Sequence, residues 1–430
     1  MSSLPSTSAE PFAALIGIDW ADQQHAVALF DCATGKTEHS TLPQQPEAIA
    51  TWAAALQARF GDQPLALCLE QSKGALIYAL LAYQFLVLYP VNPATSALYR
   101  QAFTTSRAKD DPDDALICLE LLRHHRDKLR PWRPEDAPTR ELRQLLEKRR
   151  RAVDLRTGLT NSLRDELKCS FPQALELTGE ELHSKMACDF LLRWPSLQAV
   201  QKTRKETLRK FYYAHNARRM DLVEKRLAAI AQMVPLTADP AVMEPAILAT
   251  TMLARQLLAL RASIAAFENR IAELYAAHPD RALFDSLPGA GPTLGPRLLA
   301  AFGSDRGRFD SPASIQQYSG IAPVTERSGK STWIHRRWSR PKFVHQSFFE
   351  YAGQSALHCP WARAFLDDQK ARGKTHPTAV RALAFKWQRI LFVCWRERKT
   401  YDESIYLQSL QTRGSHLISK LETTKPKPRE

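Results

Sequence analysis

Acidic residues at three points in the N-terminal part of the chain could act together on a phosphate group. Asp19 interrupts the apolar segment "LIGIDWA", where an unpaired charge is costly, and Glu70 ends the apolar run "PLALCLE". The segment "AKDDPDDALICLELL" adds Asp111 and Asp114, which lie three residues apart at the start of a predicted helix and share one face. Two-metal phosphoryl transfer needs several carboxylates at one point. We therefore predict that these four residues bind metal.

The acidic helix start leaves alternatives open. Asp110 and Asp113 have the same spacing as Asp111 and Asp114, and we prefer the second pair because the apolar residues that follow put the buried side of the helix near Asp114. Acids in a first helical turn can also simply complement the helix dipole. Taken alone, this segment favours the structural role at the helix start over metal binding. Together with the strand residues Asp19 and Glu70, metal binding is favoured.

The elements that would position these acids form an α/β domain. Strand-like segments "LIGIDWA", "HAVALFD" and "KTEHSTL" predict a three-strand meander. Helical "PEAIATWAAALQARFG" and "GALIYALLAY" then alternate with strand-like "PLALCLE" and "FLVLYPVNP". This order predicts a mixed sheet with helices on its faces, and it places the acids as a ribonuclease-H-like sheet would.

Long helices dominate the middle of the chain. One begins near Thr139 and carries a basic face that includes Arg149, Arg150 and Arg151, and a second begins near Ile247, so the two could pair as an antiparallel arm. The segment between them contains "QKTRKETLRKFYYAHNARR", whose basic and aromatic residues suit nucleic-acid binding or, equally, a solvated helix with two core tyrosines.

Two further segments could contact phosphate. "SLPGAGPTLG" holds Gly289 and Gly291 between two predicted helices, which favours either close backbone approach to a phosphate or a tight turn without a ligand. "KSTWIHRRWSRPK" interleaves two tryptophans with basic residues, a mixture that suits phosphate contacts and base stacking or forms an ordinary basic surface. The cations that we predict to contact nucleic acid here are Lys330, Arg336, Arg337 and Arg340.

Composition favours a nucleic-acid partner over a membrane. The 430 residues contain 59 Lys and Arg against 45 Asp and Glu, a net charge of +14, and the basic residues recur along helices. The seven cysteines form no CxxC pair, so neither a disulfide framework nor a zinc site is predicted. No secretory leader and no spanning helix are expected, and a cytoplasmic location follows.

The joint pattern resembles the DEDD transposases of the insertion-sequence-110 family. The D…E…DxxD order resembles that family's RuvC-like domain, and "LPGAGPTLGPRLLAAFGSDRGRF", "QYSGIAPVTERSGKS" and "ARGKTHPTAVRALAFKWQRILFVCW" resemble its C-terminal transposase domain. The resemblance implies a RuvC-like domain (1–135), a helical coiled-coil arm with an insertion (136–278), a helical C-terminal domain (279–415) and a flexible tail (416–430).

The same resemblance implies the chemistry. It places a nucleophilic serine at Ser328 in "GIAPVTERSGK", with Gly329 after it, whereas the residues alone leave Ser319, Ser331 or a plain surface turn open. It also implies Mg²⁺ in a two-metal site, double-stranded donor and target DNA, an element-encoded guide RNA, and a homodimer or homotetramer acting at the bacterial nucleoid. The alternatives are a metal-dependent nuclease or junction resolvase that uses water, and a non-catalytic nucleic-acid scaffold.

Overall fold

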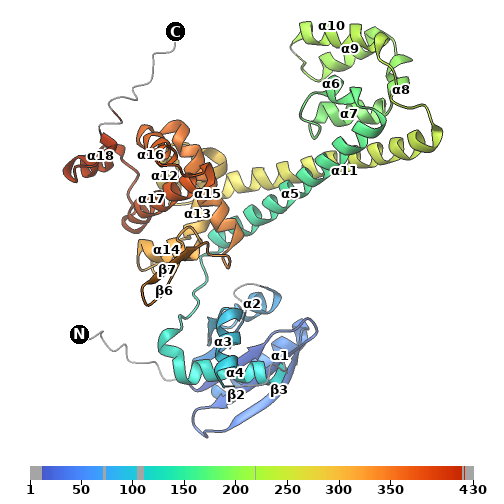
Figure 1. Cartoon of the computed structure of the whole chain (residues 1–430). Helices are drawn as coiled ribbons and strands as arrows, with labels where there is room; N and C mark the ends of the chain where they lie inside the picture. Colours follow the sequence, from blue (N-terminus) through green and yellow to red (C-terminus); the bar gives the residue numbers. More distant parts are fainter. Residues whose placement is uncertain (1–11, 71–73, 104–110, 218, 419–420, 422–430) are drawn as a thin grey trace. The chain divides into compact units, whose positions relative to one another are not determined.

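The chain divides after Pro134 into two units, each with its own cores. The computed structural model describes residues 12–70, 74–103, 111–217, 219–418 and 421 (Figure 1). Most of the tail predicted for 416–430 lies outside these residues. The two units are described in turn.

Unit 1 is built on a five-stranded mixed sheet, as the sequence predicts. Its strands follow the order β3-β2-β1-β4-β5, in which β1 pairs antiparallel with β2 and parallel with β4. The strands are β1 (Ala14–Asp19), β2 (Gln24–Asp31), β3 (Thr37–Pro43), β4 (Leu65–Leu69) and β5 (Leu86–Pro90). The helices are α1 (Pro46–Phe60), α2 (Ala75–Leu80), α3 (Pro93–Phe103) and α4 (Asp111–His125), followed by the 3₁₀ turn η1 (Arg126–Lys128).

The central strands bury both of their faces. Ile16 and Ile18 of β1 pack with residues of α1 and α2 in one core, while Leu15 packs with α4 in another. This follows from the alternation of side chains along a strand. Gly17 allows α4 to pack closely on β1, because a β-carbon at this position would lie 2.1 Å from the carbonyl oxygen of Ala115 in α4. The glycine therefore fixes α4 against the middle of the sheet.

Unit 2 contains two long helices that run antiparallel (Figure 1). The first part of α5 (Ala137–Ser170) shares a core with the end of α11 (Pro240–Ala277), and the last part of α5 shares another core with the start of α11. The start predicted near Ile247 for the second helix is wrong by seven residues. The helix begins at Pro240, and Pro245 inside it led to the later predicted start because proline usually interrupts a helix. At the true start, the Asp239 side chain accepts a hydrogen bond from the Ala241 amide 2.9 Å away. Of the described helices, α11 is also the one long and apolar enough to cross a membrane by composition.

Shorter helices lie at both ends of this pair. Between α5 and α11 come α6 (Gln173–Thr178), α7 (Lys185–Arg193), α8 (Leu197–Gln201), α9 (Lys205–Ala214), α10 (Met220–Ala229) and the 3₁₀ turn η2 (Ile230–Gln232). After α11 come α12 (Arg281–Asp285), α13 (Gly291–Phe302), α14 (Pro312–Tyr318), β6 (Val324–Ser328), β7 (Ser331–His335), α15 (Lys342–His358), α16 (Pro360–Ala371), α17 (His376–Glu397) and α18 (Glu403–Thr412). We call this last group the C-terminal body. It is mainly helical, as predicted, but the hairpin β6–β7 was not foreseen.

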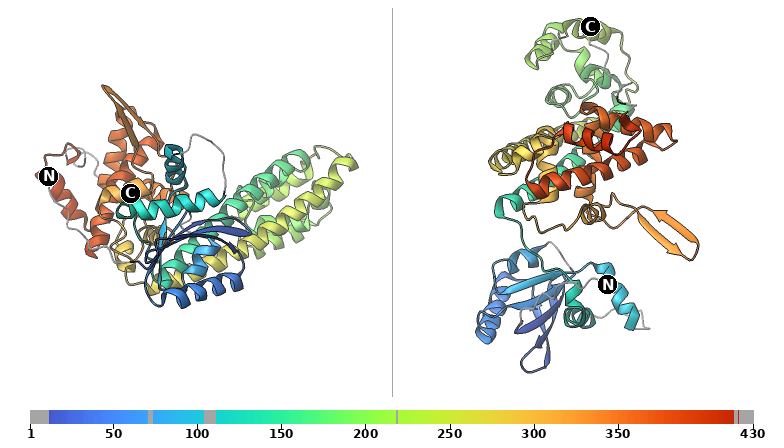
Figure 2. Two further views of the ribbon diagram at one scale, coloured as in Figure 1. Left: turned by 90° about the horizontal axis from the view of Figure 1, so that it is seen from below. Right: turned by 90° about the vertical axis from the view of Figure 1, so that its left-hand side faces the viewer.

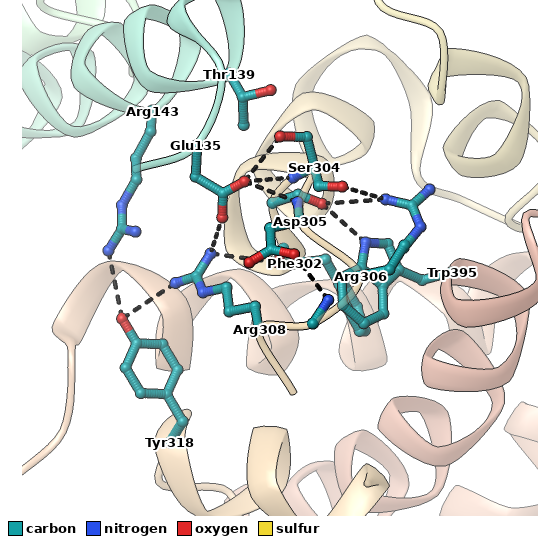
Figure 3. A network of polar contacts seen from close by, with 12 residues as sticks. Glu135, Thr139, Arg143, Phe302, Ser304, Asp305, Arg306, Arg308, Tyr318 and Trp395 are labelled. Atoms are coloured by element: carbon teal, nitrogen blue, oxygen red, sulfur yellow. Dashed lines mark hydrogen bonds and ion pairs between the residues drawn. The ribbon is translucent and has the colours of Figure 1, made fainter. Parts of the chain in front are cut away.

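The start of unit 2 is tied to the C-terminal body by Glu135 (Figure 3). One carboxylate oxygen accepts hydrogen bonds from the Ser304 amide, the Ser304 hydroxyl and the Asp305 amide at 2.7, 2.8 and 3.0 Å. The other oxygen pairs with Arg308 at 3.1 Å. Trp395 donates to the Gly303 carbonyl of the same loop at 2.8 Å. The loop after α13 is thus held from two sides.

Candidate active site

The sheet of unit 1 brings Asp19 and Glu70 to the same edge. Asp19 ends β1, and Glu70 follows the last residue of β4. The two strands are parallel neighbours in which Ile18 lies opposite Leu69, so the two acids occupy the next position along the register. The carboxyl ends of parallel strands are where such sheets present functional groups.

Asp114 lies near the start of α4, the helix that packs on this sheet, and it is 3% exposed. It forms an ion pair with Arg100 of α3, a residue that the sequence reasoning did not single out and that no motif marks. Cys118, one turn further along α4, has its pKa raised by its contact with Cys68 and by burial, and the charges of Glu70 and Asp19 add to the effect. The two strand acids therefore lie near the face of α4 that carries Asp114.

The donor set has the chemistry of a site for a hard divalent ion. Carboxylate oxygens are the ligands that Mg²⁺ prefers. Within the described parts of the chain, however, no three His, Cys, Asp or Glu side chains lie close enough to hold a metal ion. Asp110 lies outside those parts, and so do the side chains of Asp111 and Asp113. The choice between the two helical acid pairs stays a prediction.

Ser328 lies in unit 2 at the turn of an exposed hairpin (Figure 2, right view). It is the last residue of β6 and pairs with Ser331, the first residue of β7, so the turn consists of Gly329 and Lys330. Gly329 has a φ of 55°, a value that glycine adopts without strain and that a two-residue hairpin turn requires. The signal was present in the sequence, because the Ser-Gly pair marks a turn and Thr325 and Thr332, β-branched residues that favour strands, lie on either side of it.

The three candidate serines have different surroundings. Ser319 is completely buried: its hydroxyl donates to the Gln316 carbonyl at 3.1 Å and accepts from the Gln388 amide at 2.8 Å. A hydroxyl held in this way cannot reach a substrate without unfolding its surroundings. Ser328 and Ser331 are both exposed on one face of the hairpin.

Exposed aromatic and basic side chains lie on the hairpin and directly after it. Trp333 and Trp338 are 61% and 74% exposed, and the guanidinium of Arg336 lies 5.2 Å from the Trp338 ring centre. His335 pairs with Glu326 across the strands at 2.9 Å, and this hydrogen bond raises the pKa of the imidazole. Large exposed rings among cations are the features that bind single-stranded or distorted nucleic acid.

Several cations predicted to contact nucleic acid have partners within the chain. Arg149 donates to Glu268 of α11 at 3.0 Å, and Arg150 pairs with Glu350 of α15 at 3.3 Å. Arg340 packs against Gly320 and donates to the Arg337 carbonyl, and burial lowers its pKa. By contrast, the side chains of Arg151, Lys330 and Arg336 are exposed. These three remain the better candidates of the set.

The two glycines also differ. A β-carbon at Gly289 would lie 2.7 Å from the His358 ring and 3.2 Å from the Gln354 carbonyl oxygen, so this glycine is needed for packing against α15. Gly291 begins α13, and a β-carbon there would meet no atom within 4 Å. The phosphate role stays a prediction for both, but only Gly291 has the open space that it requires.

Comparison with known families covers both groups of candidate residues. A model of DEDD transposases, described as a transposase, matches residues 16–172 and includes the acids of unit 1. A second model, described as the transposase IS116/IS110/IS902 family, matches residues 281–367 and includes Ser328. The chain belongs to the IS110 family of transposases. The segment between the two matches, 173–280, is assigned by neither.

Relatives of this transposase extend over most of its length. It is 28% identical to the mini-circle putative transposase for IS117 of Streptomyces coelicolor over 401 residues, which is 90% of this chain and 95% of that protein. It is 28% identical to an uncharacterized 42 kDa protein of insertion element IS900 of Mycobacterium paratuberculosis, over 79% of this chain and 84% of that one. A putative transposase of Sinorhizobium fredii is 31% identical over 48% of this chain and 57% of its own length.

Proposed function

We propose that this transposase cuts and rejoins DNA through a covalent link to Ser328. The observation that carries the proposal is the contrast among the serines: Ser328 is exposed at a glycine turn, whereas Ser319 is buried and hydrogen-bonded at its hydroxyl. The rings and cations of the same hairpin give a DNA strand a surface to bind. Ser331 lies directly opposite Ser328 and is therefore its natural control.

The reaction conserves the phosphodiester bond energy. The Ser328 Oγ attacks a DNA phosphorus atom, an Oγ–P bond forms, and the bond from phosphorus to one deoxyribose oxygen breaks. The serine proton passes to solvent, and the released deoxyribose oxygen takes up a proton. A free hydroxyl of a second strand then attacks the phosphoserine, which restores the serine and joins the strands without ATP. A serine hydroxyl is a weak nucleophile unless it is activated.

Mg²⁺ is the ion that the carboxylates fit. Asp19, Glu70 and Asp114 would hold it together with Asp111, since all four supply hard oxygen donors. When bound, such an ion neutralises phosphate charge and lowers the pKa of an oxygen that it coordinates. Arg100 forms an ion pair with the Asp114 carboxylate. The RuvC-like description of unit 1 is part of this proposal and rests on the mixed sheet and the position of its acids.

We extend the proposal to the partners that the family resemblance implies. The net charge of +14 supports binding of double-stranded donor and target DNA and of an element-encoded guide RNA, at the nucleoid in the cytoplasm. A homodimer or homotetramer would supply several serines for strand exchange. Sequencing of RNA that copurifies with the protein, and light scattering, test these two points: absence of a defined RNA, or a monomer on DNA, contradicts them.

The decisive experiment compares single substitutions in cells that carry the gene with its native flanking DNA. Excised circles and rejoined junctions are counted for wild type, Ser328→Ala, Ser331→Ala and Asp19→Asn. We expect loss of at least a hundredfold for Ser328→Ala and Asp19→Asn, on the order of what removal of an essential catalytic group costs. Ser331→Ala removes an equally exposed hydroxyl from the same turn and is expected to retain activity. Purified protein should form a covalent DNA adduct that Ser328→Ala abolishes.

Other outcomes separate the alternatives. Strand cleavage that survives Ser328→Ala but not Asp19→Asn indicates a nuclease that uses water, and the serine mechanism is then wrong. If neither substitution changes more than DNA affinity, the protein is a non-catalytic scaffold.

A further inference from the structure

The helices between α5 and α11 form a cluster at one end of these two long helices and share a core with them (Figure 1). Its core includes Phe190, Trp194, Phe211 and Tyr212, with Trp194 and Phe211 ring centres 5.0 Å apart. The Tyr212 hydroxyl donates to the Leu177 carbonyl at 2.8 Å and thereby ties α9 to α6. We call residues 171–236 the arm-tip module. Neither family match covers its helices, so its role is not given by the catalytic parts of the chain.

The module has an open cavity of about 500 Å³ between α7 and α9. Phe211 contributes to its apolar lining, and the polar side chains around it are Asp189, Arg193, Thr207, Lys210 and His215. A cavity of this size accommodates a nucleotide-sized group. The sequence left this segment open between nucleic-acid binding and a solvated helix with two core tyrosines. Tyr212 belongs to the core, whereas Tyr213 is exposed.

The cavity has a positive charge because the negative charge of its acid, Asp189, is balanced by an ion pair with Lys185. Burial acts to raise the pKa of Asp189, but hydrogen bonds from His215 and Lys185 outweigh it and lower the pKa. The two partners lie 2.9 and 2.5 Å from the carboxylate. Arg193 and Lys210 are exposed, and among the described residues neither forms an ion pair with an acid. Two cations thus face a cavity without a compensating charge.

Other groups in the cavity suit a phosphodiester. The guanidinium of Arg193 lies 4.8 Å from the Trp194 ring centre, which holds it in place, and Thr207 offers a hydroxyl donor. Tyr213 is 73% exposed and lies one turn from Lys210 on α9, where its ring can pack on a sugar or base. A free phosphate ion would use the cations but not the ring.

We propose that the arm-tip cavity binds the phosphate backbone of double-stranded DNA outside the region that the C-terminal body contacts, with Arg193 and Lys210 as the phosphate ligands. The length of α5 favours duplex DNA. Leu142 lies in the core of the C-terminal body and Leu167 in the core of the module, and 25 residues of helix at about 1.5 Å each span about 38 Å. One turn of B-form DNA is about 34–36 Å. The inference rests on the proposed function only in taking DNA as the partner.

The test measures DNA affinity of the full-length protein against salt concentration, using a random 40-base-pair duplex. Each phosphate contact contributes about 0.9 to the slope of log K against log salt, so Arg193→Gln combined with Lys210→Gln should lower the slope by about 1.8. Between 50 and 200 mM salt, wild type should then lose about 12-fold more affinity than this variant. The conservative exchange Arg193→Lys with Lys210→Arg should keep the wild-type slope and shows that the charges, not the fold, are responsible.

A second double variant, Arg219→Gln with Lys225→Gln, removes the same charge from the same module but outside the cavity. An equal slope change in this control overturns the proposal, because the effect is then general electrostatics. An unchanged slope in the cavity variant overturns it as well, and so does tighter binding of double-stranded RNA or inorganic phosphate than of duplex DNA at the cavity. The slope reports equilibrium binding and does not depend on whether Ser328 reacts with DNA. Failure of the serine chemistry is thereby distinguished from failure of the arm-tip site.

Discussion

Removal of the Glu135 carboxylate should open the loop after α13 (Figure 3). The side chain is 12% exposed and its partner Arg308 is 19% exposed, so both charges are largely shielded from water. Glu135→Ala leaves two amide donors and one hydroxyl without this acceptor, and the Arg308 guanidinium keeps only the Phe302 carbonyl and the Tyr318 hydroxyl. We expect the structure around Ser304 and Asp305 to be strongly affected because both donate their amides to this one oxygen.

The magnitude follows from these contacts. Breaking a buried ion pair costs about 3–5 kcal/mol, and a hydrogen bond to a charged group contributes about 1.5–3 kcal/mol. Both side chains keep some exposure and water can enter after substitution, so about 3 kcal/mol is a reasonable value for Glu135→Ala. Because about 1.4 kcal/mol is a tenfold change, the open population of the loop rises about 100-fold. Glu135→Gln keeps the shape but not the charge, and about half of the loss is expected.

Hydrogen exchange measured by mass spectrometry reads this opening directly. The peptide that contains Ser304 and Asp305 should exchange about 100-fold faster in Glu135→Ala. Glu141→Ala is the matched control, since Glu141 lies in the first part of α5, shortly after Glu135, and likewise pairs with one arginine, Arg270, but both of those side chains are over 40% exposed. Such surface pairs contribute about 0–1 kcal/mol. Exchange that rises less than threefold in Glu135→Ala, or equally in both variants, refutes the reasoning.

Two further predictions concern packing and burial. Gly17→Ala places a β-carbon 2.1 Å from the Ala115 carbonyl oxygen and should destabilise unit 1 by about 1–3 kcal/mol in urea unfolding. The control Gly158→Ala lies in a helix with open space around it and should stabilise the protein by about 0.5–1 kcal/mol. Equal effects of the two substitutions contradict the close contact at Gly17. Burial lowers the pKa of His345 to about 4 in the folded protein. As the pH falls below 6.5, this histidine is protonated in the unfolded chain before it is protonated in the folded one. The folded state therefore loses stability between about pH 6.5 and pH 4. After discounting for partial exposure, His345→Gln should reduce the stability difference between pH 7 and pH 4.5 by about 1 kcal/mol; an unchanged difference shows that this ring does not titrate as described.

The sheet of unit 1 could be predicted because its strands have few alternatives. β1 and β4 are short apolar runs bounded by polar residues. Strands with both faces covered are apolar along their whole length, and such a pattern does not fit an amphipathic helix. The position of Asp19 and Glu70 at one edge follows from that prediction alone. The hairpin β6–β7 was missed for the opposite reason. Its strands are exposed and mostly polar, and strand formation there depends on the Gly329 turn more than on a buried face.

The net charge of +14 shows how composition can mislead about a binding surface. Arg149 and Arg150 stand in a basic run, yet Arg149 pairs with Glu268 and Arg150 with Glu350, each more than a hundred residues away in sequence. Arg150 also pairs with Asp154, one turn along α5. Arg193 and Lys210 also have charged neighbours, but Asp189, the acid at their cavity, pairs with Lys185 and His215 and not with them. A cation contributes to nucleic-acid binding only where the fold gives it no closer anion, since the pair would otherwise have to be broken first. Arg193 and Lys210 of the arm-tip module meet this condition, and the basic face of α5 does so only at residues such as Arg151 that remain exposed.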